Sequence, residues 1–370
     1  MKFTTNRDTM LQAISIAQDV INNKSYVSIL SNVLLETAEG KVIVKSTNSQ
    51  VSIITYFGAE ILEEGTTTIF CDKLMSVISS LPPGLVEVYT KDRVVNIKPV
   101  EKKVSFKINS LASDKFPIID RFKVDTAFSI KAKDFKSLIK NCIFAVASDP
   151  VRYFLTGCFL CHLDGKLTMV ATDGRRMSFS GTEGNYPEVA SIIPTKILSM
   201  ILKFCSDDED LFMNIDKQSI AIKSNDIEFS SSLIDGQYPK WQKVLPDSLN
   251  SSVTVAKKDL EDALKTAGVM LQKDNRIHVF ISDGKMELAT SPDNELGSAT
   301  EEISAIYTGE PAELILQASF LSDVIKVINA DDIKIEFTAN EDKKILRAIL
   351  IKGSDTSDAD YTHVIMPMSC

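Results

Sequence analysis

Three segments of the chain share one pattern, in which an apolar run is followed by an acidic-Gly-Lys turn and a second run rich in apolar residues. The three segments are residues 35–44, 160–169 and 280–288. The pattern is typical of a β-hairpin, because glycine accepts the backbone conformation that a tight turn requires. The turn glycines are Gly40, Gly165 and Gly284, which are 125 and 119 residues apart. Solenoid repeats are shorter than this, so the spacing predicts a domain that occurs three times.

Amphipathic helix patterns recur at about half this period, roughly every 60 residues, with apolar residues that fit the 3.6-residue repeat. We expect helices to begin near Thr5, Cys71, Lys131, Pro194, Ala256 and Gln317. Alternating segments rich in β-branched residues lie between them, at 86–99, 211–231 and 333–351. Each unit is therefore one helix plus several strands. Two units make an α+β domain of roughly 120 residues, a usual size for a domain with its own core.

Composition places the chain among globular proteins, since 44% of its residues are hydrophobic. No apolar run approaches the roughly 20 residues that a membrane helix needs. The first residues, MKFTTNRD, lack the apolar stretch of a signal peptide. We therefore expect a cytoplasmic protein with no membrane partner.

The cysteines do not predict a disulfide scaffold, because there are only 6 in 370 residues. Cys71, Cys142 and Cys205 fall on apolar helix positions, where a small buried side chain is expected. Cys158 and Cys161 lie close to His162, but strand residues three apart point to opposite faces. No second pair follows at zinc spacing. We expect no metal site and no cofactor.

Charge is distributed unevenly along the chain. The whole chain carries −9, whereas the six predicted helices together are positive. In the third helix Lys133, Lys136 and Lys140 form a stripe away from the apolar face, and the fourth helix carries Lys196 and Lys203. An ordinary solvated face would explain one such helix. Repeated in an acidic chain, the pattern favours a surface that faces an anion.

Enzyme motifs are missing from the sequence. It has no phosphate-binding loop, dinucleotide fingerprint, nucleophile elbow or His-Glu-x-x-His motif. The acidic run at residues 207–210 leaves a Mg-dependent nucleic-acid-processing enzyme as an alternative, although a solvated turn explains it better. Asp173 has no identifiable partner for acid–base chemistry. The sequence therefore favours a binding protein, and a scaffold that binds only proteins is a further alternative.

Several motifs are similar to those of the bacterial DNA polymerase III beta subunit family, the replication sliding clamps. They are residues 1–4 (MKFT), 29–35 (ILSNVLL), 151–157 (VRYFLTG), 171–177 (ATDGRRM), 238–246 (YPKWQKVLP) and 364–368 (VIMPM). They occur in the family's order and the resemblance covers the whole chain.

This resemblance implies three tandem clamp domains, which we place at residues 1–124, 125–250 and 251–370. Helices would line a central hole and sheets would form the outer wall. Two chains in head-to-tail contact would close a ring around duplex DNA and tether the replicative polymerase to it, without catalysis. Contacts to phosphates alone would allow sliding on any sequence.

The resemblance also assigns residues to DNA and to the dimer contact. The DNA-facing residues would be Lys24, Lys73, Lys133, Lys136, Lys140, Lys196 and Lys203. The homodimer interface would contain Phe106, Ile108, Met270 and Leu271. Asp149 departs from the family pattern, because a carboxylate in this loop would repel phosphate.

A peptide-binding cleft would lie between the second and third domains. Its residues would be Leu155, Thr172, Gly174, Arg175, Arg176, Met177, Pro239, Lys243, Val244, Val364, Ile365, Met366, Pro367 and Met368. By resemblance it would take short linear motifs of the Gln-Leu-x-Leu-Phe type from the DNA polymerase III alpha subunit, the clamp loader, other polymerases and repair proteins. Methionine side chains suit such a site because they adapt to differing apolar anchors. Arg175 stands where the family often has His, and Ser369-Cys370 replaces a common Arg-Leu ending.

Overall fold

The computed structural model describes residues 1–21, 28–272, 274–290, 297–339, 345, 347–355 and 361–368. Helices begin close to each of the six predicted starts. They are α1 (Arg7–Gln18), α2 (Cys71–Ser80), α3 (Ala132–Cys142), α4 (Thr195–Phe204), α5 (Lys257–Gly268) and α6 (Ala318–Val327). In α1 the predicted apolar face is buried at Met10, Ile14 and Ala17. The Asn6 side chain accepts a hydrogen bond from the Asp8 backbone N–H at 2.8 Å and caps the start of this helix.

Strands fill the segments between the helices. The first third of the chain has β1 (Lys2–Asn6), β2 (Asn32–Ala38), β3 (Lys41–Thr47), β4 (Val51–Gly58), β5 (Glu60–Glu63), β6 (Gly65–Phe70), β7 (Leu85–Lys91), β8 (Val94–Pro99) and β9 (Phe106–Asn109). The middle third has β10 (Phe128–Lys131), β11 (Gly157–Leu163), β12 (Lys166–Thr172), β13 (Arg176–Glu183), β14 (Ala190–Pro194), β15 (Asp210–Ile215), β16 (Ser219–Ser224) and β17 (Ile227–Ser232). The last third has β18 (Ser251–Ala256), β19 (Arg276–Ser282), β20 (Lys285–Ala289), β21 (Thr300–Thr308), β22 (Ala312–Gln317), β23 (Asp332–Phe337), β24 (Ile349–Gly353) and β25 (Tyr361–Ile365).

The three predicted hairpins are confirmed as β2–β3, β11–β12 and β19–β20. Their turn glycines have positive φ angles, with 74° at Gly40, 80° at Gly165 and 78° at Gly284. These are left-handed conformations that glycine adopts without the steric cost of a side chain.

Strand order repeats three times and confirms the tandem architecture. One set of four strands runs β4-β3-β2-β6 in the first third, β13-β12-β11-β14 in the second and β21-β20-β19-β22 in the third. The other set runs β1-β7-β8-β9, β10-β15-β16-β17 and β18-β23-β24-β25. Each domain is therefore two helix-plus-sheet units, as the half-period of the helices predicted.

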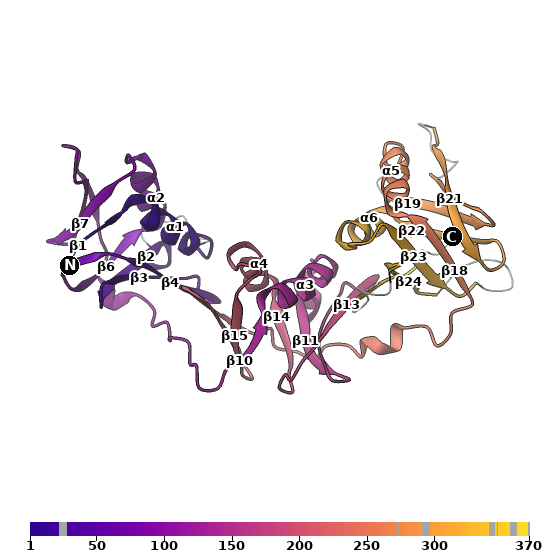
Figure 1. Ribbon diagram of the computed structural model, residues 1–370, viewed down its shortest axis with the longest axis horizontal. Coiled ribbons are helices and arrows are strands. Elements are labelled where there is room, and N and C mark those ends of the chain that lie inside the picture. The colour runs from indigo at the N-terminus through magenta and orange to yellow at the C-terminus, as the bar shows by residue number, and fades with distance from the viewer. Residues whose placement is uncertain are drawn as a thin grey trace. The chain divides into compact units, whose positions relative to one another are not determined.

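The chain divides into two compact units, the first being Met1–Lys133 with Lys196–Leu233. It contains a five-stranded sheet and an eight-stranded sheet. In the eight-stranded sheet, β17 of the middle third pairs antiparallel with β4 of the first third, from Ile227↔Thr55 to Ser231↔Val51. Helices α1 and α2 pack against each other (Figure 1).

The second unit is Asp134–Thr195 with Ile234–Cys370. Its twelve-stranded sheet joins the middle and last thirds through the antiparallel pair β13–β25, from Arg176↔Ile365 to Ser180↔Tyr361. Helices α5 and α6 pack against each other. The predicted boundaries at residues 124 and 250 stay a prediction, because the compact units divide the middle third.

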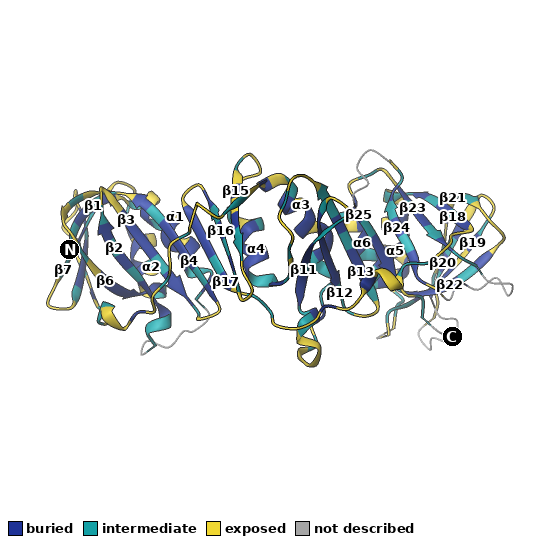
Figure 2. Ribbon diagram, turned by 90° about the horizontal axis from the view of Figure 1, so that it is seen from below, coloured by how far each residue is buried: buried dark blue, intermediate teal, exposed yellow. Residues whose placement is uncertain are grey.

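The cores follow the predicted periodicities. Figure 2 shows buried residues concentrated in the strands and helices and exposed residues mostly in turns and connectors. Cys71, Cys142 and Cys205 are buried in helix faces or just after a helix, as predicted. No helix among the described residues has the length and apolarity to cross a membrane.

Candidate functional site

An apolar cluster lies on one face of the sheet where β13 meets β25. We call it the junction cluster, and its buried members are Ala147, Leu155, Val170, Met177, Ile192, Tyr238, Trp241, Ala348 and Val364. Met177 and Val364 are register partners across the strand pair, so their side chains lie on the same face. The structure thus brings together three residues of the predicted peptide cleft, Leu155, Met177 and Val364.

Residues next to the junction cluster in the sequence are exposed. Pro239, Lys243 and Val244 flank or lie in the short 3-10 helix Trp241–Val244, and their side chains are exposed while Trp241 is buried. After β25, Met366 is exposed and its backbone N–H donates to the Arg175 carbonyl at 2.9 Å. An apolar floor edged by exposed apolar and cationic side chains is suited to binding a peptide with apolar anchors.

The C-terminal segment after β25 is fixed by backbone contacts. Pro367 and Met368 are half-buried, and the Met368 N–H donates to the Ile315 carbonyl at 2.8 Å. Ile315 lies in β22, so this segment is tied to the last domain rather than projecting from it. The final residues, Ser369 and Cys370, lie outside the described residues.

The turn between β12 and β13 is held by a set of local hydrogen bonds. The Thr172 hydroxyl donates to the Arg176 carbonyl at 2.6 Å and accepts from the Gly174 N–H at 3.0 Å. One Asp173 oxygen accepts from the N–H groups of Arg175 and Arg176 at 2.8 and 3.0 Å. Asp173 therefore shapes the turn. Its carboxylate accepts hydrogen bonds from the turn and from Arg176, which is a structural role. The Arg175 side chain is left exposed at the tip.

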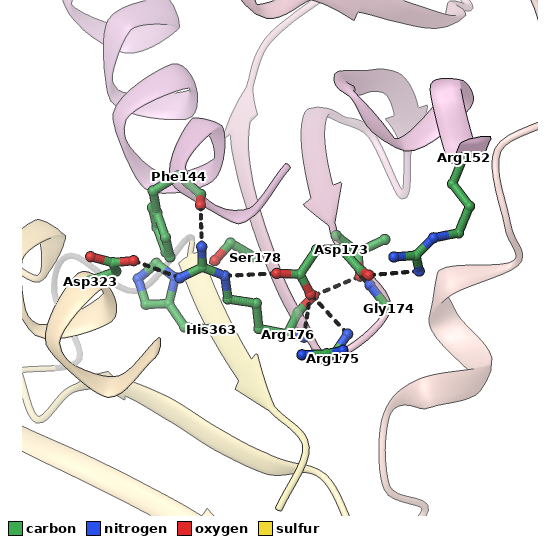
Figure 3. Close-up of polar contacts among 10 residues, drawn as sticks. Phe144, Arg152, Asp173, Gly174, Arg175, Arg176, Ser178, Asp323 and His363 are labelled. Carbon is green, nitrogen blue, oxygen red and sulfur yellow. Dashed lines mark hydrogen bonds and ion pairs between the residues drawn. The ribbon is translucent and has the colours of Figure 1, made fainter. Parts of the chain in front are cut away.

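Gly174 adopts a backbone conformation that other residues rarely take, and it leaves room for a neighbouring side chain. Its φ is 87°, and a Cβ there would lie 2.7 Å from Nη1 of Arg152. That same Arg152 nitrogen donates to the Asp173 carbonyl at 2.8 Å. The glycine thus allows an arginine from the preceding 3-10 segment to lie directly against the turn (Figure 3).

Arg176 and Ile365 lie on the opposite face of the sheet from the junction cluster, whereas we expected them beside Met177 and Val364. Adjacent strand residues point to opposite faces, so Arg176 cannot line the same surface as Met177, nor Ile365 the same surface as Val364. Ile365 packs in the core of the last domain. The guanidinium of Arg176 lies 4.5 Å from the Phe320 ring centroid and 5.4 Å from that of Phe144.

Every guanidinium nitrogen of Arg176 has an acceptor inside the chain (Figure 3). Nε donates to Asp173 at 3.1 Å, and the two Nη atoms donate to Asp323 and to the Phe144 carbonyl, each at 2.7 Å. Asp323 lies in α6, so the contact ties the middle domain to the last domain. A planar, forked cation suits this role better than a lysine would. Arg176 is therefore placed to hold the domain junction, and its part in the peptide cleft stays a prediction.

His363 lies in the same strand pair, 2.8 Å from the Ser178 hydroxyl, and is completely buried. Burial disfavours the imidazolium and lowers the pKa of His363 from the ordinary 6.5 to about 3. The other two histidines, His162 and His278, also lie in strands.

Acid should therefore destabilise the chain through His363. Between pH 6.5 and 3 the unfolded state binds a proton at this residue and the folded state does not, so stability falls as the pH falls. The free energy of unfolding should lose about 1.4 kcal/mol per pH unit in this window. Urea unfolding at pH 7, 6, 5 and 4 should show a smaller slope for His363→Gln than for the native chain. Equal slopes would contradict this assignment.

Five of the predicted DNA-facing lysines are exposed or paired with an acid. Lys73, Lys133 and Lys140 are exposed on α2 and α3. Lys196 and Lys203 on α4 are both paired with Asp19.

Lys136 departs from the predicted open stripe, since it is only 8% exposed. Ala132 and Ile139, four residues before and three after it on the same side of α3, are both fully buried, so Lys136 lies at the edge of the buried face. Lys24 lies outside the described residues.

Three of the four residues predicted for the dimer contact line two grooves. The first, of about 680 Å³, lies between α2 and β9 and is lined by Phe106, Ile108 and Lys73 among others. The second, of about 490 Å³, lies between α5 and α6 and includes Leu271. Val269, which caps the end of α5, is 81% exposed. Met270 next to it is half-buried.

Glu209 and Asp210 of the acidic run that suggested metal chemistry, and Asp149 of the loop expected to repel phosphate, have partners inside the chain. Glu209 accepts hydrogen bonds from the Ser206 N–H at 2.5 Å and from the Ser224 hydroxyl at 2.7 Å, and Asp210 pairs with Lys131 at 2.8 Å. Asp149 accepts from the Val151 N–H at 2.9 Å and caps a 3-10 helix. In the described part of the chain, no three His, Cys, Asp or Glu side chains are grouped as a metal site.

Sequence reasoning missed Tyr238, Trp241 and Asp19. Tyr238 and Trp241 form the floor of the junction cluster, and the Phe159 and Tyr238 rings stack at 4.7 Å. The one tryptophan of the chain, inside a motif already noted, was the available signal. Asp19 had no signal, because it is far in sequence from the lysines that it meets.

Comparison with known proteins gives a consistent result along the whole chain. Family models of the DNA polymerase III beta subunit match in order, the N-terminal domain at residues 1–120, the central domain at 129–240 and the C-terminal domain at 242–369. The beta sliding clamp of Treponema pallidum is 33% identical over 375 residues, covering 100% of this chain and 99% of that protein.

Solved structures agree with this result. The DNA polymerase sliding clamp of Pseudomonas aeruginosa with ligand has a TM-score of 0.91 and 25% identity, covering 100% of both chains. A Pseudomonas aeruginosa sliding clamp bound to griselimycin has a TM-score of 0.92 at 25% identity, again over 100% of both chains. The Bacillus subtilis clamp, at 22% identity and a TM-score of 0.92 over 100% of this chain and 99% of that one, shares the fold.

Proposed function

The chain belongs to the DNA polymerase III beta subunit family, the bacterial sliding clamps, and from this membership we propose how its residues carry out the clamp's work. A sliding clamp is a non-catalytic processivity factor that binds DNA and polymerase and assembles with itself. The enzyme alternative is therefore set aside. We place its action in the cytoplasm, where a bacterial chromosome is replicated.

The observation that carries the proposed ring is the repeated junction between domains. The first five residues of β4, 51–55, pair with β17, and the first five of β13, 176–180, pair with β25. β17 and β25 are the last strands of their four-strand sets, and β9 holds the same place in the first domain. By repetition, residues 300–304 of β21 should pair with a β9 strand. Within the described residues, β9 pairs only with β8, and residues 300–304 pair only with β20. We infer that β9 of one copy pairs with β21 of a second copy.

This contact joins two different surfaces of the chain, so it is heterologous. Such a contact forms a closed ring only if the rotation that it imposes from one copy to the next adds up to a full turn. Domains joined by the same strand pairing inside the chain provide that rotation. The groove between α2 and β9 would receive the exposed end of α5, where Val269 and Leu271 lie. Lys107 on β9 is exposed, and so is Glu302 on β21, which pairs with Lys285 at 2.6 Å within the chain.

The DNA surface of the proposed ring is the lysine-bearing faces of α2, α3 and α4. Cations without a base-reading arrangement bind phosphates irrespective of sequence, and this allows sliding. The topological test is retention on nicked circular duplex DNA and release when the circle is linearised. A chain that binds only proteins would not be retained, and one that binds DNA laterally would not be released.

Charge reversal should weaken this hold on DNA. With Lys133→Glu and Lys140→Glu together, we expect less loading and faster release from nicked circles, most clearly at low salt where screening is least. The slope of log K against log salt should fall by about 0.9 for each phosphate that the ring no longer neutralises. The matched control is Lys91→Glu with Lys217→Glu, two exposed lysines of strand ends and turns. Unchanged retention across a salt series would refute the DNA-facing assignment.

The junction cluster and its exposed edge are the proposed peptide site. The support is the chemistry of the surface and the griselimycin-bound relative, whose ligand is bound by a clamp of the same fold. We propose that the DNA polymerase III alpha subunit, the clamp loader, other polymerases and repair proteins bind here through short linear motifs. Apolar anchors of the motif would contact the cluster, and Met366 and Val244 would adapt to them.

A further inference from the structure

One carboxylate holds two of the proposed DNA-facing lysines. Asp19 lies at the end of α1, and its two oxygens are 3.4 Å from Nζ of Lys196 and 2.6 Å from Nζ of Lys203. The lysines are seven residues apart, about two helical turns, so they lie on the same side of α4. All three residues belong to the same compact unit.

Without these lysines, the position of Asp19 would be unfavourable for an ionised carboxylate. The end of a helix carries partial negative charge, which repels a carboxylate. Partial burial also works against its ionised form, but hydrogen bonds and charges of Lys203 and Lys196 outweigh these effects and hold the pKa of Asp19 below its usual value. Asp19 is therefore ionised at neutral pH and reduces the positive charge of this part of α4.

Helix α3 carries the same lysine spacing without the acid. Lys133 and Lys140 are also seven residues apart and both are exposed. In the described part of the chain neither has an ion-pair partner. The two helices of the middle domain thus present one open lysine pair and one pair whose charge a single carboxylate halves.

We propose that Asp19 holds the α4 lysine pair away from DNA phosphates and so limits how strongly the ring binds duplex DNA. The proposal rests on the proposed DNA-facing role of these helices. A phosphate that approaches Lys196 and Lys203 must displace Asp19 or stay beside its negative charge. Asp19 is thus a positioning residue that keeps the hold on DNA weak enough for movement along the duplex.

The test compares Asp19→Asn with the native ring in binding a short duplex over a salt series. The amide removes the charge at nearly constant size, so the lysines become available to phosphates. We expect tighter binding at low salt and a salt slope steeper by about 0.9 for each additional phosphate that a protomer neutralises. Single-molecule tracking on stretched DNA should show slower diffusion. Asp19→Glu, which keeps the charge, should restore both properties.

Two controls separate this effect from a general change in charge or stability. Asp164→Asn makes the same charge change in a hairpin turn, where φ is 51° and asparagine is well tolerated. It should leave the salt slope unchanged. Thermal unfolding of each variant measures any weakening at the contact of α1 with α4, and such weakening alone would not steepen the slope.

A second comparison removes the lysine pairs themselves, with and without the charge of Asp19. In the native chain, Lys133→Gln with Lys140→Gln should reduce the salt slope more than Lys196→Gln with Lys203→Gln. In the Asp19→Asn background the two double substitutions should reduce it equally. If Asp19→Asn leaves the slope unchanged while the α3 substitutions reduce it, the DNA-facing surface stands and the proposal for Asp19 is overturned. If no substitution changes the slope, the DNA-facing assignment fails and the proposal fails with it.

Discussion

Replacing Leu271 with aspartate should convert the ring into a monomer of 40.8 kDa. Leu271 follows α5 and lines the groove between α5 and α6 on the surface proposed for the second copy. A charge placed in an apolar contact costs at least about 2 kcal/mol at a central interface position. Both interfaces of the ring would carry it, so the dimer is weakened by about 4 kcal/mol, or roughly a thousandfold in Kd. Sedimentation velocity at micromolar concentration measures the result.

Phe106→Asp should have the same effect from the other side of the contact, since Phe106 lines the groove beside β9. Val124→Asp is the matched control, an exposed apolar residue of the connector between the first two domains. It should leave the dimer intact. A stable dimer for both Leu271→Asp and Phe106→Asp at nanomolar concentration would refute the proposed interface.

Mixing the two variants tests the head-to-tail arrangement itself. A Phe106→Asp chain and a Leu271→Asp chain can form one contact with both native surfaces, while the second contact carries both substitutions. We expect a dimer that forms but stays open and is not retained on nicked circular DNA. A head-to-head contact would instead leave each variant one fully native interface with a copy of itself, so each would dimerise without the other and mixing would add nothing.

Features that depend on nearby residues were predictable from the sequence. The six helices and three hairpins follow from local periodicity and turn chemistry, and the structure confirms them. The pairing of β17 with β4 and of β13 with β25 was not predicted, because strands of separate domains carry no local signal for one another.

The site was predicted less completely, for two physical reasons. A family motif gives positions along the chain but not the face to which each side chain points, so Arg176 and Ile365 were placed beside Met177 and Val364. Ion pairs between distant segments are also invisible in a sequence. The contacts of Asp323 with Arg176 and of Asp19 with the α4 lysines therefore emerged only from the structure.

Deleting residues 367–370 should abolish binding of a peptide with a Gln-Leu-x-Leu-Phe-type motif while the ring stays folded. The deletion removes the half-buried Pro367 and Met368 and the hydrogen bond from Met368 to the Ile315 carbonyl. It keeps Val364 and Ile365, whose pairing with β13 holds the sheet together. Without the segment that follows β25, Met366 loses the support that keeps it at the edge of the junction cluster. We expect affinity to fall at least a hundredfold, about 2.7 kcal/mol, in fluorescence polarisation.

Two further variants locate the cause of this effect. Removing only residues 369–370 keeps the Met368 hydrogen bond, so it should retain most of the affinity. Val244→Asp leaves the C-terminal segment intact but places a charge at the exposed edge of the 3-10 helix, where an apolar peptide anchor would lie. It should weaken peptide binding without changing thermal unfolding, because the Val244 side chain is exposed. Full affinity in both the 367–370 deletion and Val244→Asp would contradict the proposed site. The peptide would then bind away from the junction cluster, on a surface that neither β25 nor the 3-10 helix Trp241–Val244 forms.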